Sequence, residues 1–447
     1  MALRVAVVGS GPAGFYAAEA LLAAGARVDV LERLPTPFGL VRLGVAPDHP
    51  ELKTAARAFE QTAAREGFRF FGNVHVGRDV GHDELARLYD AVVYAVGAQS
   101  DRRLGIPGED LPGSWAATEF VAWYNGHPDY QELRFDLGCE RAVVVGNGNV
   151  AIDVARMLAR TADELAPTDV TEQSAAALAA AGVREIVMLG RRGPAQAAFT
   201  PPELKELGEL RGADVVVDPA DLELDPASEA ALGADRARAR RNVDILRAFA
   251  ARPPAGKPKR LALRFCVSPV AILGTDRVEA VEVVRNELVA GADGTIRAVP
   301  TDRRETIPCG LVLRSVGYRG VPLPGVPFDE GRGVIPTERG RVPGRPGVYA
   351  AGWIKRGPSG VIGTNKKDAA ETVEALLEDA RAGLLEHEEG DLGELLRARG
   401  VAVVDYRGWQ AIDAWERALG EERGRPRVKL TRWDELLAKA RELHSVR

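Results

Sequence analysis

Runs of apolar residues that end at a glycine recur along the chain, and patterns typical of helices follow several of them. Residues 5–8 are apolar and precede Gly9, and three valines at residues 143–145 precede Gly146. Further apolar runs of strand length include residues 28–31, 89–98, 186–189, 309–317 and 347–353. Short apolar runs that alternate with helical patterns predict parallel strands joined by helices, which is the organisation of an α/β fold.

Two linkers rich in Pro and Gly divide this pattern. They occupy residues 101–115 and 318–347, and such composition marks loops rather than strands or helices. We therefore predict a first domain at residues 1–101, a second at 102–317, and a return to the first at 318–447. This last part ends in a charged C-terminal tail, from about residue 386, that is helical in places. The first domain is thus expected to be discontinuous.

The residues after the first apolar run of each domain form a glycine turn. These turns contain Gly9, Gly11 and Gly14 in one case, and Gly146 and Gly148 in the other. The first Gly makes a tight turn, the second lets the backbone approach a pyrophosphate, and the helix N-terminus faces the negative charge. One such turn is a weak signal, because an ordinary strand-to-helix turn can look the same. Two turns favour two dinucleotides, as in a flavin that exchanges a hydride with a nicotinamide.

The residues downstream of each turn indicate which dinucleotide binds there. Glu32 ends the apolar run after the first turn, and a carboxylate there accepts hydrogen bonds from the hydroxyls of an unphosphorylated ribose, as in FAD or NAD. The run after the second turn ends instead in Arg191 and Arg192. Two guanidinium groups suit the 2′-phosphate of NADP, although an arginine pair on a surface is often only solvated. An excursion at residues 161–182 is expected between the helix and this strand.

Composition narrows the class of protein. The chain has 447 residues and a net charge of −5, which favours more than one domain and argues against general nucleic-acid binding. It contains no apolar run long enough to span a membrane, and a strand that starts at Leu3 leaves no room for a leader peptide. Three scattered cysteines form no CxxC pair and fit a reducing cytoplasm. We expect a cytoplasmic enzyme without a redox-active cysteine pair.

Taken together, the motifs resemble those of the adrenodoxin reductase-like ferredoxin–NADP⁺ reductases over nearly the whole chain. They lie at residues 9–14, 37–50, 72–79, 123–126, 146–156, 190–194, 198–205 and 352–363. The last motif is the most specific, because most relatives on this fold have an Asp where Trp353 stands. The resemblance implies a glutathione reductase-like α/β fold with two Rossmann-like domains, for FAD and NADP, the FAD domain being discontinuous. It also implies hydride transfer between NADPH and FAD, coupled to one-electron transfer with a ferredoxin-type iron–sulfur protein.

By the same resemblance, specific residues contact the two cofactors. Those expected at FAD are Gly9, Gly11, Ala13, Gly14, Glu32, Leu40, Val76, Trp353, Gly360, Val361 and Ile362. Those expected at NADP are Asn147, Gly148, Asn149, Val150, Arg191, Arg192 and Glu203. Without the family, Trp353 could equally be a core residue. Its flanking glycines and the cations at 355 and 356 favour a place where backbone approaches a ligand.

Two further residues, His49 and Asp153, are implied as catalytic. Taken alone, His49 could be an ordinary loop histidine and Asp153 an exposed helix acid. A carboxylate that faces inwards on the helix after the second turn is costly unless it is paired. Hydride transfer needs no nucleophile, so the resemblance implies that both residues order water and the nicotinamide amide. No metal is expected.

A basic segment at residues 236–264 suggests where an acidic partner binds. It holds ten Lys or Arg residues and one acid, Asp244, in a chain that is acidic overall. Such a run is often only a solvated face, but complementary potentials also accelerate encounter with an acidic iron–sulfur protein. The best candidates for docking a ferredoxin are Lys205, Arg240, Arg241 and Arg247.

Other functions remain open from the sequence. One is a flavin-dependent NADPH oxidase or monooxygenase on the same fold, which rapid formation of a hydroperoxyflavin would identify. Another is an electron-input subunit of a larger complex. A non-enzymatic NADP sensor is less favoured, because it would have no use for two complete cofactor sites.

Overall fold

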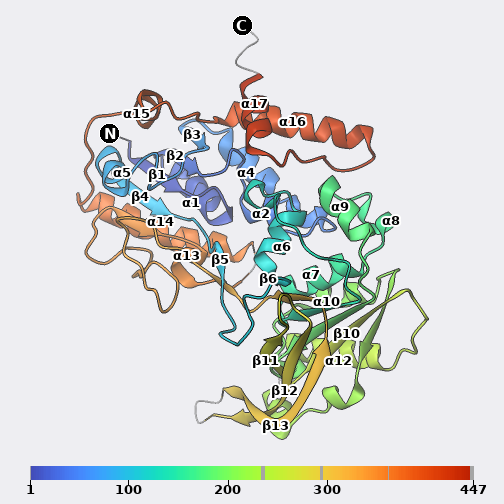
Figure 1. Ribbon diagram of the computed structural model, residues 1–447. Coiled ribbons are helices and arrows are strands. Elements are labelled where there is room, and N and C mark those ends of the chain that lie inside the picture. The colour runs from blue at the N-terminus through green and yellow to red at the C-terminus, as the bar shows by residue number, and fades with distance from the viewer. Residues whose placement is uncertain (1, 233–236, 292–294, 361, 443–447) are drawn as a thin grey trace. The chain divides into compact units, whose positions relative to one another are not determined.

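In the computed structural model, residues 2–232, 237–291, 295–360 and 362–442 are described, and the chain forms two compact units (Figure 1). The first unit contains residues 1–100, 125–131 and 317–447, and the second contains residues 101–124 and 132–316. Each unit is built on a parallel sheet with helices, as the alternating apolar runs predict.

The sheet of the first unit has the strand order β16-β4-β1-β2-β3. Its strands are β1 (Arg4–Val8), β2 (Arg27–Glu32), β3 (Phe68–Gly72), β4 (Ala91–Tyr94) and β16 (Val348–Ala350). All neighbours are parallel, and Val5 of β1 pairs with Val28 of β2. Since parallel strands end at the same edge of a sheet, the residues after β1 and after β2 lie side by side. Gly9 and Glu32 are therefore brought to one edge.

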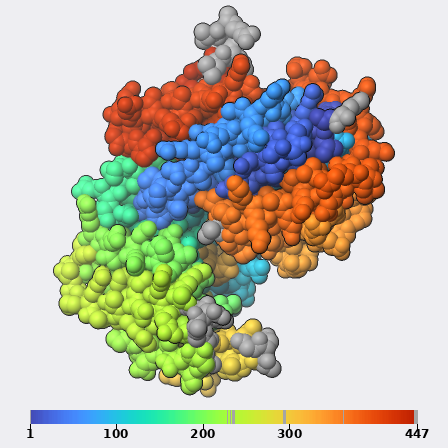
Figure 2. All heavy atoms as spheres, turned by 180° about the vertical axis from the view of Figure 1, so that it is seen from behind, coloured from blue at the N-terminus to red at the C-terminus, as the bar shows by residue number. Residues whose placement is uncertain are grey.

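Helices and an aromatic cluster cover this sheet. The long helix α14 (Thr364–Arg381) packs on α1 (Pro12–Ala23), and Figure 2 shows the orange C-terminal segment beside the blue N-terminal one. The aromatic cluster joins the N-terminal helices to the C-terminal tail, and it contains Phe15, Phe38, Phe59 and Trp409. The helices are α1 (Pro12–Ala23), α2 (Leu40–Leu43), α3 (Pro50–Lys53), α4 (Ala56–Ala63), α5 (His82–Leu88), α13 (Trp353–Arg356), α14 (Thr364–Arg381), α15 (Leu392–Ala398), α16 (Tyr406–Glu422) and α17 (Trp433–Glu442).

The parallel sheet of the second unit has the order β6-β14-β7-β8-β10-β9. An antiparallel sheet, β11-β12-β13, packs on it through a cluster that includes Val143, Val187, Val281 and Val312. The strands are β6 (Ser114–Ala116), β7 (Arg141–Val145), β8 (Glu185–Gly190), β9 (Ala213–Val217), β10 (Lys259–Phe265), β11 (Val267–Leu273), β12 (Ala280–Ala290), β13 (Ile296–Pro308) and β14 (Leu311–Arg314). β7 and β8 are parallel neighbours, so Gly146 and Arg191 follow at the same edge.

The predicted excursion at residues 161–182 is helical in part. It contains α8 (Ala162–Leu165) and α9 (Glu172–Ala179), and the side chains of Thr161 and Thr171 cap their N-termini. Such caps are what these residues supply at a helix start. The other α-helices of the unit are α6 (Ala117–Tyr124), α7 (Asn149–Ala159), α10 (Pro201–Leu207), α11 (Pro226–Ala231) and α12 (Ala237–Ala250).

One segment groups differently from the expected domain bounds. Residues 125–131, placed by the sequence in the second domain, belong to the first unit. Asp129 forms an ion pair with Arg33 at 2.7 Å and accepts a hydrogen bond from the Trp433 indole at 2.9 Å. The Lys429 ammonium lies 3.4 Å from the Asn125 amide oxygen. These contacts reach residues far away in the chain, which explains why no local pattern indicated them.

A buried carboxylate anchors β2. Asp29, in the middle of this strand, accepts a 2.5 Å hydrogen bond from the Tyr89 hydroxyl and bonds of 2.8 and 2.6 Å from Arg69. Hydrogen bonding to Asp29 raises the pKa of Arg69, whereas burial is the main cause that raises the pKa of Tyr89, with the charge of Asp29 adding to it. The network fixes the strand that ends at Glu32.

We expect Asp29→Asn to lower the free energy of unfolding by roughly 2–3 kcal/mol, because a buried amide cannot accept hydrogen bonds from both the Tyr89 hydroxyl and the Arg69 guanidinium. The control is Asp391→Asn, which changes the more exposed partner of the same Arg69 and keeps a residue suited to a helix N-cap. It should cost less than about 1 kcal/mol. Chemical denaturation followed by circular dichroism measures both, and equal losses would contradict the anchoring role.

Candidate functional site

The first glycine turn leaves open space at the start of α1. Gly9 has φ +106°, and a Cβ there would lie 2.5 Å from the Ala95 carbonyl oxygen. Only glycine therefore fits this turn. At Gly11, the residue that precedes the helix, a Cβ would meet nothing within 4 Å. A ligand phosphate can thus approach the backbone at the helix N-terminus.

Glu32 lies beside this turn. Its Oε2 accepts hydrogen bonds from the Ser10 backbone N–H at 3.1 Å and the Ser10 hydroxyl at 2.6 Å, and its Oε1 accepts one from the Leu34 N–H at 3.0 Å. Both carboxylate oxygens are therefore held at the edge where the turn opens. This is the placement that the sequence predicted for an acid that binds ribose hydroxyls.

The other residues expected near FAD differ in exposure. Ala13 and Gly14 are buried in the first turn of α1, and Val76 is buried in the loop after β3. Leu40 is 40% exposed, which is high for a large apolar side chain. It is therefore available to contact an apolar ring.

Trp353 begins α13 directly after β16. Its indole Nε1–H donates to the Ser359 carbonyl oxygen at 3.2 Å, and its ring lies 5.3 Å from that of Tyr318. Gly360 is exposed, and Ile362 packs against the aromatic cluster that contains Phe15, Phe38, Phe59 and Trp409. Val361 lies outside the described residues. Tyr318 was not predicted, because it follows the second unit in sequence and carries no motif of its own.

The second glycine turn repeats the geometry of the first. Gly146 has φ +144°, and a Cβ there would lie 2.2 Å from the Ser315 carbonyl oxygen, whereas one at Gly148 would meet nothing within 4 Å. The Asn149 side chain accepts a hydrogen bond from the Thr200 N–H at 2.8 Å. The buried Oδ1 of Asn147 has no hydrogen-bond partner among the described residues. Together with the half-buried Val150, these residues form a cradle with a polar atom left to bond a ligand.

Arg191 and Arg192 follow β8 at the same edge. The Asn286 amide donates to the Arg191 carbonyl oxygen at 2.8 Å, and the Cys266 N–H donates to that of Arg192 at 3.0 Å. Their backbones are thus fixed, while no ion pair to either guanidinium occurs in the described part of the chain. Burial lowers the pKa of Arg192, and the charge of Arg191 lowers it further. Two adjacent cations of this kind suit a phosphate dianion.

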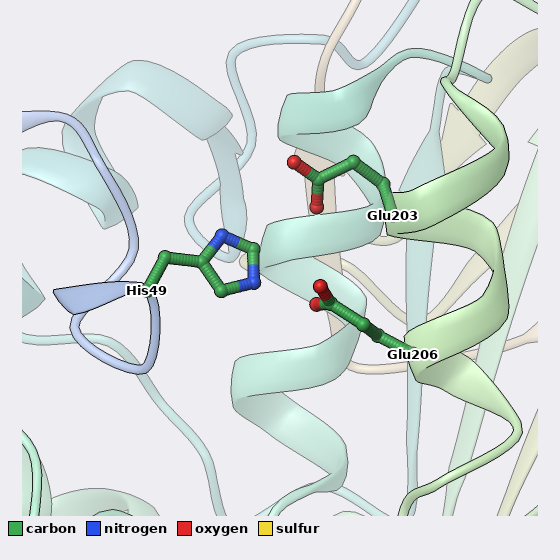
Figure 3. Close-up of side chains that lie close together, drawn as sticks. All are labelled: His49, Glu203 and Glu206. Atoms are coloured by element: carbon green, nitrogen blue, oxygen red, sulfur yellow. The ribbon is translucent and has the colours of Figure 1, made fainter. Parts of the chain in front are cut away.

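Asp153 and Glu203 share a partner that sequence reasoning missed. Arg156 on α7 is fully buried, and its guanidinium lies 2.6 Å from Asp153, 3.5 Å from Glu203 and 3.4 Å from Glu206. Figure 3 shows Glu203 and Glu206 extending from the same helix, α10. The i,i+3 spacing of Asp153 and Arg156 on one helix was the available signal.

His49, also labelled in Figure 3, belongs to the first unit. It precedes α3, and only 4% of its surface is exposed. Its N–H donates to the Ala46 carbonyl oxygen at 3.1 Å. Burial distinguishes it from an ordinary loop histidine, while its catalytic role stays a prediction.

Only part of the basic segment is free. Lys259 donates to the Leu158 carbonyl oxygen at 2.6 Å, Arg264 pairs with Glu305 at 2.8 Å, and Arg240 donates to the Leu232 carbonyl oxygen at 2.8 Å. Arg236 lies outside the described residues. Among the residues expected to dock a partner, Arg241 and Arg247 on α12 and Lys205 on α10 are exposed and have no acid paired with them within the described ranges.

Across residues 2–232, 237–291, 295–360 and 362–442, no helix is long and apolar enough to cross a membrane.

Comparison with known proteins identifies relatives of similar length. The chain is 51% identical to NADPH-ferredoxin reductase FprA of Mycobacterium tuberculosis, over 97% of this chain and 98% of that protein. It is 45% identical to the mitochondrial NADPH:adrenodoxin oxidoreductase of Homo sapiens, over 97% and 91%. The solved structure of Mycobacterium tuberculosis FprA in complex with NADPH matches with a TM-score of 0.95 at 50% identity, covering 98% of this chain and 100% of that one.

A family model, "Pyridine nucleotide-disulphide oxidoreductase", matches residues 3–186. The fold class and the resemblance predicted from the sequence are thereby confirmed. The chain belongs to the adrenodoxin reductase-like ferredoxin–NADP⁺ reductases.

Proposed function

We propose that this protein is an FAD-dependent NADPH:ferredoxin oxidoreductase. The observation that carries the proposal is the contrast between its two turns: Glu32 lies at the first, and the Arg191–Arg192 pair lies at the second. The first environment suits an unphosphorylated ribose and the second a 2′-phosphate. FAD and NADP(H) are the cofactors of the family, and the printed names of its relatives specify NADPH with ferredoxin or adrenodoxin.

The residues of the first unit fit FAD. The open space at Gly11 and the α1 N-terminus would hold its pyrophosphate, and Glu32 its ribose. The remaining residues assigned to FAD are Gly9, Ala13, Gly14, Leu40, Val76, Trp353, Gly360, Val361 and Ile362. FAD, when bound, supplies the exchange between a two-electron hydride and single electrons.

The residues of the second unit fit NADP(H). The open space at Gly148 and the α7 N-terminus would hold the pyrophosphate, and the two guanidinium groups would hold the 2′-phosphate. The Oδ1 of Asn147 is an acceptor and would bond a donor group of the ligand. Asn149, Val150 and Glu203 complete the assigned set. We propose that His49 and Asp153 order water and the nicotinamide amide. Hydride transfer needs no nucleophile, so its rate depends on how the two rings are positioned.

An acidic iron–sulfur protein is the partner that the exposed cations favour. Lys205, Arg241 and Arg247 project from α10 and α12, which pack on each other in the second unit. Arg240, which bonds a backbone carbonyl, has a smaller part in docking. We place the reaction in the cytoplasm, where ferredoxin-type carriers and NADPH are both available.

The direct test is NADPH-driven reduction of cytochrome c through a ferredoxin, measured on protein whose released flavin is identified. We expect one noncovalent FAD per chain and a rate that depends on the ferredoxin. Protein that holds FMN, or that consumes oxygen at the same rate without ferredoxin, would overturn the proposal.

Removing either guanidinium should weaken the binding of NADPH but not that of NADH. Arg191→Ala and Arg192→Ala each lose charged hydrogen bonds worth roughly 1.5–3 kcal/mol, or about ten- to hundredfold in affinity. The KM for NADPH should rise accordingly, while that for NADH serves as the control and should change little. Equal increases for both coenzymes would show that the arginines stabilise the fold instead.

Reversing charge on α12 should slow only the step that involves the partner. The double variant Arg241→Glu/Arg247→Glu should reduce cytochrome c more slowly through ferredoxin and lose most of its salt dependence, because salt screens surface steering. Ferricyanide reduction should stay near that of the unchanged protein. Arg381→Glu/Arg397→Glu, at exposed residues of α14 and α15, makes the same charge change as a control. Normal coupling in the α12 variant at low salt would place the docking surface elsewhere.

A further inference from the structure

A fully buried carboxylate in the C-terminal tail bonds a residue near the N-terminus. Glu416, in the middle of α16, accepts two hydrogen bonds from Arg42 on α2, at 2.8 and 2.6 Å. The side chains are 0% and 5% exposed. Arg427 at 3.0 Å and the Leu430 N–H at 2.9 Å supply further contacts to the same carboxylate. Every part of this carboxylate is therefore engaged.

Arg42 lies next to the segment that covers the first glycine turn. The Phe38 N–H donates to the Ser10 carbonyl oxygen at 3.0 Å, and a Cβ on Gly39 would lie 3.0 Å from the Gly11 Cα. Phe38 has φ +81°, a conformation that non-glycine residues rarely adopt and that neighbouring contacts must hold. Leu40, the residue assigned to FAD, follows directly. The backbone of residues 38–42 is therefore constrained against the turn.

The tail also supplies the aromatic contacts of this segment. The Trp409 ring, on α16, lies 5.6 Å from that of Phe38 in an edge-on arrangement. The Arg42 guanidinium lies 5.0 Å from the same Trp409 ring. In Figure 1 the red helix α16 lies on the blue N-terminal helices of its unit. One helix of the tail thus contacts both Phe38 and Arg42.

A second part of the tail holds the residue that follows Glu32. Arg33 pairs with Asp129 at 2.7 Å, and its guanidinium lies 5.9 Å from the ring of Trp433 on α17. The Trp433 indole donates to the same Asp129. Residues of the tail therefore contact both the chain after β2, through Trp433, and residues 38–42, through Trp409 and Glu416.

A buried ion pair is a costly way to attach a helix. Desolvation of both charges offsets much of their attraction, and apolar residues of similar size often stabilise a fold as well or better. What the pair adds is geometry, because a bidentate contact fixes the planar guanidinium in one orientation.

We propose that the Arg42–Glu416 pair is a positioning device for FAD, by which the C-terminal tail holds residues 38–42 against the first glycine turn. Arg42 and Glu416 are positioning residues, because they act through Phe38, Gly39 and Leu40. The inference goes beyond the proposed function, since it concerns how FAD is retained whatever the electron acceptor.

The experiment compares Glu416→Gln, Arg42→Lys and the control Glu421→Gln, which changes an exposed acid of the same helix. Full-length holoprotein is diluted, and the release of FAD is followed by the rise of flavin fluorescence below the melting temperature of each variant. Glu416→Gln leaves the buried Arg42 without a carboxylate partner and removes one of the two carboxylates of the half-buried Arg427, so we expect FAD to leave about tenfold faster. Arg42→Lys keeps the charge but loses the fork, and should release FAD several-fold faster. The control should match the unchanged protein.

A merely stabilising pair would lower the melting temperature and leave the release of FAD from folded protein unchanged, and that result would overturn the proposal. Where Glu416→Gln does not fold, Arg42→Lys decides, and unchanged release from this variant equally overturns it. The visible absorption spectrum of bound flavin should also change in shape for both variants. Because no ferredoxin is present, failure of the electron-partner proposal leaves this test unaffected.

Discussion

The close approach of backbone to an anion at a helix N-terminus is the constraint on which the rest of the structure depends. Helices α1 and α7 both begin at a residue where a side chain would point into open space, Gly11 and Gly148. Unpaired N–H groups and the helix dipole favour negative charge there. The first glycine of each turn, Gly9 or Gly146, lies so close to a neighbouring carbonyl that no side chain fits at that position. Each unit therefore presents one edge suited to a phosphate, and we propose that each binds a dinucleotide there.

What distinguishes the two edges is the residue delivered by the neighbouring strand. In the first unit β2 brings Glu32, which the Asp29 network holds in register. In the second unit β8 is followed by two arginines whose carbonyl groups accept hydrogen bonds from Asn286 of β12 and from Cys266, which lies between β10 and β11. Their guanidinium groups form no ion pair in the described part of the chain. We propose that the two edges bind different dinucleotides because the residues at the end of the neighbouring strand are acidic in one unit and basic in the other.

The strands and glycine turns at these edges were predictable from the sequence, because they are local features, whereas the ligand contacts assigned to them stay predictions. The family motif added Leu40 and Trp353, whose exposure and neighbours are compatible with contact to a ring. Contacts between distant segments were beyond it: Arg156 of α7 pairs with Glu203 of α10, and Glu416 bonds an arginine 374 residues earlier. No periodicity encodes such pairs. The basic segment was overestimated as a surface, because Lys259 and Arg264 bond within their own unit.

The central claim is that the second unit recognises a 2′-phosphate through Arg191 and Arg192. It is tested most directly by calorimetric titration of the protein with two fragments that lack nicotinamide, 2′,5′-ADP and 5′-AMP. Because the fragments differ only in the 2′-phosphate, their affinity ratio isolates its recognition. The account predicts that 2′,5′-ADP binds at least about a hundredfold more tightly, as two charge-assisted contacts would give. Equal affinities for the two fragments would contradict it.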